Sequence, residues 1–148
     1  MRVAFDTNFL LYAEGFDDPL RRDMATELLG RIPADRLVIP AQVLAEFGYA
    51  MRRKGGKPAE AVRRACAHWE MLAVIPPSTG ATVMAAMELL AQHQIPVFDG
   101  VILAASMEAG CQILLSEDFH HGFAWQGVTV VNPFREPDHP LLRRAQEW

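Results

Sequence analysis

Short runs of consecutive apolar residues alternate along the chain with longer segments in which apolar residues recur every three or four positions. Short, wholly apolar runs predict buried strands, and the periodic segments predict helices. The predicted strands are 2–6, 37–39, 72–75, 111–116 and 128–131, and the predicted helices are 19–29, 41–54, 58–71, 79–94 and 99–109, with one helical turn at 9–13. The polar tail after residue 134 is expected to add at most one more helical turn.

Strands separated by helices imply an α/β fold, in which a parallel sheet is covered on both faces. The 148 residues fit a single domain, and no linker or repeat divides them. Such sheets bind ligands beyond the carboxyl ends of their strands, where the strand order reverses. Candidate functional residues are therefore sought at that edge.

Four acidic residues lie at the ends of predicted strands, at the start of a predicted helix, or close to the apolar face of a helix. Asp6 follows the first predicted strand, Asp118 follows the fourth, and Asp99 opens the helix between the third and fourth strands. Glu46 lies close to the apolar stripe of helix 41–54. If strands one and four are neighbours, the three aspartates converge. Carboxylates at the edge of a core are costly without positive charge, which a shared divalent metal ion would supply.

Each acid also has a simpler interpretation. Asp6 fits a turn that follows a strand, and Asp99 is favoured by the dipole of a helix N-terminus. Asp118 fits an ordinary loop acid, and Glu46 fits an ion pair with a nearby arginine. Only the joint placement of the four acids favours a common site.

The net charge of −4 argues against binding of nucleic acid by a basic surface alone. One segment, residues 52–64, nevertheless holds six basic residues against a single acid. It is either a solvated helix end or a contact for a phosphate backbone. The weak candidates for such a contact are Arg52, Arg53, Lys54 and Lys57.

The two cysteines, Cys66 and Cys111, form no metal-binding or disulfide pattern and are interpreted as reduced core residues. A reducing cytoplasm is the expected location, because the sequence predicts no secretory signal and no membrane span. Met84 and Met87 are expected to fill the core. His120 and His121 are interpreted as loop residues within reach of a substrate.

Four short motifs follow one another along the chain. They read FDTNFLLYA at 5–13, AEF at 45–47, FDGVILAA at 98–105 and LSEDF at 115–119, and VNPF at 131–134 comes after them. Together they resemble PIN-domain nucleases, especially VapC-like toxins of toxin–antitoxin pairs. A single Asp-Thr-Asn is weak evidence, but four motifs in order at compatible spacing are strong evidence, and the resemblance spans residues 3–134.

The resemblance implies a three-layer α/β/α sandwich with a short central parallel sheet, strand one lying beside strand four. It also implies a Mg²⁺- or Mn²⁺-dependent endoribonuclease, a homodimer, and a cognate antitoxin that blocks the cleft. By matching position, the catalytic and metal-binding acids would be Asp6, Glu46, Asp99 and Asp118, with Asn8 and Ser116 as supporting polar groups.

The chain departs from the resemblance on either side of the third acid. Many relatives have tryptophan before that acid and alanine after it, whereas this chain has Phe98 and Gly100. We expect this difference to alter the fit of the substrate and to leave metal binding intact.

An all-oxygen ligand set favours magnesium or manganese. Because magnesium takes only one or two direct carboxylates, Asp6 and Asp99 are expected to lie closest to the ion, and Asp118 and Glu46 to act partly through water. The expected reaction is hydrolysis of RNA by a metal-activated water, which leaves a 5′-phosphate and a 3′-hydroxyl.

Two other functions remain open from the sequence. A haloacid-dehalogenase-like phosphatase also places an aspartate after strand one, but it needs a second aspartate where this chain has Asn8, and a late lysine, whereas none follows Lys57. A PIN-like module that binds nucleic acid or a partner without cleavage is the other alternative.

Overall fold

The computed structural model describes residues 1–147, which form a five-stranded sheet in the order β2-β1-β3-β5-β4. The four strands β2, β1, β3 and β5 run parallel, and the short strand β4 pairs antiparallel with β5. The strands are β1 (Arg2–Phe5), β2 (Leu37–Val38), β3 (Cys111–Leu115), β4 (Ala124–Trp125) and β5 (Val128–Val131).

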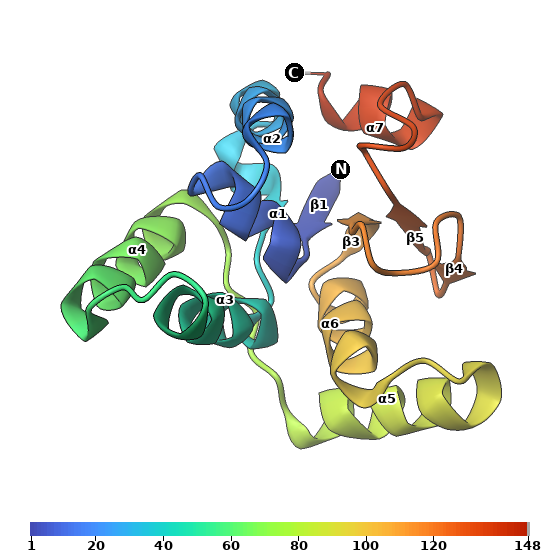
Figure 1. Cartoon of the computed structure of the whole chain (residues 1–148). Helices are drawn as coiled ribbons and strands as arrows, with labels where there is room; N and C mark the ends of the chain where they lie inside the picture. Colours follow the sequence, from blue (N-terminus) through green and yellow to red (C-terminus); the bar gives the residue numbers. More distant parts are fainter. Residues whose placement is uncertain (148) are drawn as a thin grey trace.

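Helices cover both faces of this sheet, with α2 and α7 on one side and α3, α5 and α6 on the other (Figure 1). The expected three-layer α/β fold is therefore confirmed. The helices are α1 (Thr7–Ala13), α2 (Pro19–Arg31), α3 (Ala41–Arg53), α4 (Ala59–Leu72), α5 (Gly80–His93), α6 (Val97–Glu108) and α7 (Pro140–Ala145), with a short 3₁₀ turn at Ala34–Arg36.

Strand β1 lies directly beside β3, as the convergence of the acids requires. Phe5 pairs with Leu115, and the backbone N–H of Asp6 donates to the carbonyl of Leu115 at 3.0 Å. Both strands are almost wholly buried, because every side chain of β1 after Arg2 faces apolar neighbours. The residues that follow β1 and β3 are thereby fixed side by side at the carboxyl edge.

The predicted strand at 72–75 is wrong. Helix α4 continues through Leu72, and Val74 makes only an isolated parallel bridge with Val38. Prolines stand immediately beyond both segments, at positions 40 and 76, and their missing N–H groups prevent a longer ladder.

Two short elements of the C-terminal third were not predicted at their observed length. Strand β4 turns into β5 through Gln126 and Gly127, which both have positive φ, as a tight hairpin requires. Helix α7 spans Pro140–Ala145 and packs Leu142 and Ala145 into the core.

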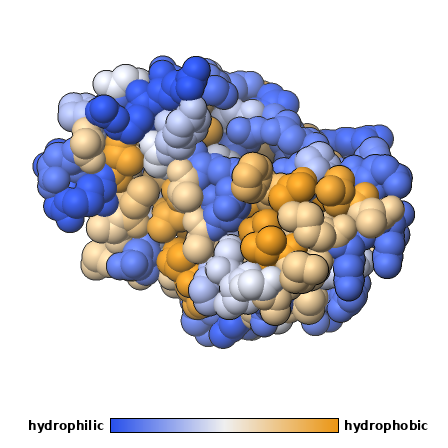
Figure 2. Space-filling model, turned by 90° about the horizontal axis from the view of Figure 1, so that it is seen from below, coloured by the Kyte–Doolittle hydropathy of each residue, from blue (hydrophilic) through white to orange (hydrophobic). Residues whose placement is uncertain are grey.

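Helix α5 exposes methionines that were expected to be buried. Met84 is 64% exposed, and Met87 is also exposed, together with Val83 and Leu90 on the same helix. Figure 2 views the molecule from the side on which α5 lies, and hydrophobic residues gather on that face. Cys66 is likewise only half buried, whereas Cys111 is buried as expected, and both thiols are free. No helix within residues 1–147 is long and apolar enough to cross a membrane.

Candidate acidic site at the carboxyl edge of the sheet

Asp6 lies between β1 and α1 and caps the N-terminus of that helix. Its carboxylate accepts hydrogen bonds from the backbone N–H of Thr7 at 2.7 Å and from the hydroxyl of Ser116 at 2.6 Å. Burial raises the pKa of Asp6 above its ordinary value despite these two bonds, and the negative charges of Glu46 and Asp118 raise it further. The site therefore holds Asp6 in a place where its negative charge is costly.

Asp99 lies in the first turn of α6, which begins two residues earlier than expected, at Val97. Burial raises the pKa of Asp99 to about 6, and the nearby charges of Asp6, Glu46 and Asp118 contribute to the rise. The four predicted acids, which lie far apart in the sequence, therefore act on one another through their charges.

Glu46 reaches this region from the middle of α3. One carboxylate oxygen accepts from the hydroxyl of Thr7 at 2.7 Å, and the other accepts from the side-chain amide of Gln42 at 3.2 Å. The alternative of an arginine partner for Glu46 is not observed. Thr7 was not singled out from the sequence, although its position directly after Asp6 at the start of α1 is a usable signal.

The segment after β3 brings Asp118 and Ser116 to the same edge. Ser116 is buried, and its hydroxyl donates to Asp6 while it accepts from the backbone N–H of Phe119 at 3.2 Å. Asp118 is exposed and accepts a hydrogen bond from the side-chain amide of Asn8. Asn8 and Ser116 thus lie where supporting groups were expected, between the acids.

None of the four acids forms an ion pair with a positive side chain within residues 1–147. The groups gathered here are carboxylate, hydroxyl and amide oxygens, which are the donors that Mg²⁺ and Mn²⁺ prefer, so these residues fit such an ion in their chemistry. In the arrangement described for residues 1–147, no three acidic, imidazole or thiol groups lie close enough together to hold a metal ion.

A known protein family matches the part of the chain that carries the acids. The model of the PIN domain family matches residues 3–122, a range that contains all four of them. The chain belongs to the PIN domain family. No curated protein sequence matches the chain significantly.

Solved structures share the fold of this PIN domain at low sequence identity. VapC20 of Mycobacterium tuberculosis, a toxin that cleaves the sarcin–ricin loop, is 21% identical with a TM-score of 0.66, over 78% of this chain and 89% of VapC20. A toxin–antitoxin complex from Klebsiella pneumoniae is 16% identical with a TM-score of 0.65, over 86% and 95% of the two chains. FitAB bound to a DNA fragment is 17% identical with a TM-score of 0.69, over 93% and 99%.

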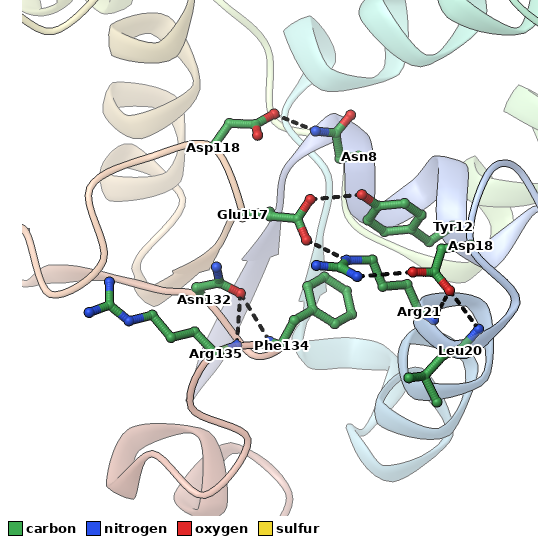
Figure 3. A network of polar contacts seen from close by, with 10 residues as sticks. All are labelled: Asn8, Tyr12, Asp18, Leu20, Arg21, Glu117, Asp118, Asn132, Phe134 and Arg135. Atoms are coloured by element: carbon green, nitrogen blue, oxygen red, sulfur yellow. Dashed lines mark hydrogen bonds and ion pairs between the residues drawn. The ribbon is translucent and has the colours of Figure 1, made fainter.

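A second polar cluster lies beside the acids of the PIN domain (Figure 3). Glu117 accepts from the Nε of Arg21 at 2.6 Å and from the hydroxyl of Tyr12 at 2.7 Å. Arg21 also pairs with Asp18 at 3.0 Å and places its guanidinium 5.2 Å from the ring centre of Phe134. This network joins α1 and α2 to the segment that supplies Asp118.

No pattern in the sequence singles out Glu117, which directly precedes Asp118. Its partner Arg21 is 96 residues away, and no local pattern connects the two. Burial raises the pKa of Tyr12 to about 12, and its hydrogen bond to Glu117 adds to the shift, so the hydroxyl stays protonated and donates.

The histidines near Asp118 have different surroundings. His120 is exposed. The two ring nitrogens of His121 contact the backbone N–H of Asn132 at 3.0 Å and the carboxylate of Glu136 at 2.9 Å. His121 therefore ties the loop after β3 to the turn after β5.

The basic segment is exposed and lies outside the acid cluster. Arg52 and Arg53 end α3, Lys54 follows as its cap, and Lys57 lies in the turn before α4. Arg52 donates to the carbonyl of Lys57 at 3.1 Å. Arg53 donates to the hydroxyl of Tyr49 at 2.5 Å, so one residue of this segment contacts an aromatic ring.

Gly100 has a packing role that the sequence did not indicate, and the expected effect on substrate fit stays a prediction. A Cβ at this position would lie 3.1 Å from the Cβ and 3.2 Å from the Cα of Ala86 on α5. Glycine therefore lets α5 approach α6 closely, next to the turn that holds Asp99.

Proposed function

We propose that this PIN domain is a divalent-metal-dependent endoribonuclease that acts as the toxin of a toxin–antitoxin pair. The observation that supports the proposal best is that Asp99 interacts through its charge with the three other acids, and that none of the four pairs with a positive side chain within residues 1–147. Their mutual repulsion is costly to the folded chain when they are ionised, and a cation that comes from outside would relieve it.

The roles of the residues follow from their burial and hydrogen bonds. Asp6 and Asp99 are the two acids whose pKa is raised by burial, and they would hold the ion most directly, with Glu46 and Asp118 around them. Ser116 holds the carboxylate of Asp6, Thr7 holds that of Glu46, and Asn8 holds that of Asp118. A bound Mg²⁺ or Mn²⁺ would supply Lewis-acid chemistry, lowering the pKa of a water and neutralising charge on the scissile phosphate.

The biological setting is proposed from the family and from its solved members. VapC20 is described as a toxin, and other structures with this fold are toxin–antitoxin complexes. On this basis the chain would have a cognate antitoxin that covers the acids, and would act as a homodimer. Its free thiols fit a reducing compartment, so the cytoplasm is the proposed location.

An RNase assay with and without EDTA tests the activity. We expect cleavage of single-stranded RNA only with Mg²⁺ or Mn²⁺, and products that end in a 5′-phosphate and a 3′-hydroxyl. Asp6→Asn and Asp99→Asn should each lower the rate by more than about 100-fold, the upper range for losing an outer-shell partner of a metal. Asp23→Asn, an exposed acid on α2, is the matched control and should keep the activity.

The outcomes separate the alternatives. A 2′,3′-cyclic phosphate product would contradict hydrolysis by water. Binding of RNA without cleavage in either metal would support a non-catalytic module. Growth arrest of a bacterial host by the wild type, and not by Asp6→Asn, would support the role as a toxin.

A further inference from the structure

Two aromatic side chains are exposed on the helices that supply the acids. Tyr49 on α3 and Phe98 on α6 are each 62% exposed, whereas most large aromatic residues of the chain are buried or half buried. Tyr49 lies one helical turn after Glu46, and Phe98 immediately precedes Asp99. Helices α3 and α6 also contact each other.

Tyr49 belongs to a polar stripe on α3. Residues 42, 46, 49 and 53 are spaced by three or four positions, so Gln42, Glu46, Tyr49 and Arg53 share one side of the helix. The guanidinium of Arg53 lies 5.8 Å from the ring centre of Tyr49. This side of α3 therefore carries, in order, an acid of the site, an exposed ring and the positive charge of Arg53 against that ring.

Phe98 points away from α5. Gly100 faces Ala86 on α5, and two residues along a helix correspond to a rotation of about 200°. Phe98 therefore lies on the opposite side of α6, and α3 and α5 flank α6 on different sides (Figure 1). Each exposed ring thus lies close to one predicted acid along its own helix, Tyr49 one turn from Glu46 and Phe98 next to Asp99.

We propose that Tyr49 and Phe98 are stacking surfaces for the bases of single-stranded RNA on either side of the phosphate held at the acids. The proposal rests on the nuclease function proposed above and names how the substrate is held. Exposed bases of single strands stack on aromatic rings and on arginine planes, and this stacking tolerates different sequences.

The local positive charge beside Tyr49, rather than the overall charge of the chain, favours a nucleic acid as the occupant. A chain with a net charge of −4 and an acidic site repels RNA, so affinity has to come from uncharged stacking and from local basic groups. The guanidinium of Arg53 lies over the ring of Tyr49 and adds positive charge there. The exposed side chains of Arg52, Lys54 and Lys57 continue the positive charge beyond it. The exposed apolar side chains of α5, in contrast, lie on a helix that carries none of the four site acids and no arginine.

Binding of matched RNA oligomers tests the proposal. We would measure the Kd of fluorescein-labelled oligouridylate, and of the same strand with abasic residues, using Asp6→Asn protein in Mg²⁺ so that the RNA stays intact. Adding Tyr49→Ala or Phe98→Ala should weaken binding of the normal strand about 5- to 140-fold, and should leave binding of the abasic strand unchanged.

Two further variants separate stacking from other causes. Tyr49→Phe keeps the ring and should retain most of the affinity for the normal strand. Met71→Ala removes an apolar side chain that is 86% exposed at the end of α4, and should change neither strand. An equal loss for normal and abasic strands, or no loss at all, would overturn the proposal; in the second case the rings would be left as contacts for a protein.

The result is independent of the test of activity. If the wild type cleaves RNA but neither aromatic variant changes Kd, the stacking proposal fails and the nuclease proposal stands. If the wild type cleaves no RNA in either metal, the nuclease proposal fails, and the comparison of normal with abasic strands still decides whether the rings bind bases.

Discussion

Glu117 and Asp118 are adjacent in the sequence, but their carboxylates belong to two groups with different electrostatics. Glu117 and Asp18 share Arg21, whose guanidinium also lies against the ring of Phe134. Asp118 accepts a hydrogen bond from the uncharged amide of Asn8, and its charge raises the pKa of Asp6 and of Asp99. The chain thus neutralises one group with its own arginine and leaves the other without a positive partner.

The pKa shifts of the two groups have opposite directions. The backbone N–H of Leu20, and then Arg21, lower the pKa of Asp18 below its ordinary value. Burial and neighbouring acids raise the pKa of Asp99 to about 6. The contrast teaches that the first group stabilises the fold as it stands, whereas the second is arranged at a cost to the fold.

Addition of metal should separate the two groups most strongly. An ion present at about 100 times its Kd stabilises a folded protein by about 2.7 kcal/mol, which corresponds to a rise in Tm of roughly 5–10 °C for a chain of this length. We expect Mg²⁺ or Mn²⁺ to give this rise in the wild type, measured by thermal unfolding against EDTA. Asp99→Asn should lose it and Glu117→Gln should keep it; the reverse pattern would show that the groups are misassigned.

Removal of Arg21 should turn the neutralised group into an uncompensated one. In Arg21→Met, the partly buried Glu117 loses its charged partner, which is expected to lower the free energy of unfolding. Urea unfolding measures the loss. The double variant Arg21→Met/Glu117→Gln should recover most of it, because no buried charge is then left unpaired. Equal stability of the single and double variants would contradict the comparison.

The pH dependence of the metal-free protein should distinguish the groups by sign. The folded-state pKa of Asp99 is about 6, above its ordinary value of 3.8, so the folded state binds the proton more tightly. The destabilisation of the fold by ionised Asp99 is therefore absent below the unfolded pKa and grows as pH rises from about 4 to 6. Over this interval we expect the free energy of unfolding of the wild type to fall by about 1–2 kcal/mol relative to that of Asp99→Asn, after allowance for solvent screening.

Asp18 should show the opposite sign, because its pKa is lowered: its contribution is present above the unfolded pKa and is lost as pH falls. Urea unfolding in EDTA at several pH values measures both effects. A wild type whose stability does not change relative to Asp99→Asn between about pH 4 and 6 would remove the electrostatic argument for the acid site.

The smallest effect is expected at Thr7, whose uncharged hydroxyl donates a single hydrogen bond to the carboxylate of Glu46. Thr7→Val keeps the shape and removes this donor, which should cost about 0.5–1.5 kcal/mol in urea unfolding. Thr7→Ser keeps the donor and is the control. A loss in Thr7→Ser as large as that in Thr7→Val would assign the effect to the methyl group instead.

The parts of the fold that were predicted correctly rest on local patterns. Wholly apolar runs identify β1, β3 and β5, and the parallel arrangement that follows from them places Asp6 beside Ser116. Periodicity identifies the helices that carry Glu46 and Asp99, although α6 begins at Val97 rather than at Asp99. The pairing of strands one and four followed only from the resemblance to PIN domains, so local patterns alone left the convergence of the three aspartates conditional on that pairing.

The errors arise where distant partners decide the outcome. Residues 72–75 are apolar but have only the two-residue strand β2 to pair with, so the segment forms a single bridge. Strand β4 is too short for an alternating pattern, and only Gln126-Gly127 marks its turn. The pairing of Glu117 with Arg21 and the exposure of Met84 depend on contacts that no window of sequence contains.

The contact between Gly100 and Ala86 links two positions that are separated by fourteen residues in the sequence. Because a methyl group at position 100 would meet both the Cα and the Cβ of Ala86, only one of the two helices can bring a side chain to their crossing point. Homologues with alanine after the third acid are therefore expected to compensate on α5 with glycine or with a wider helix separation. The two sites should covary through evolution, and an alignment of close relatives would reveal it.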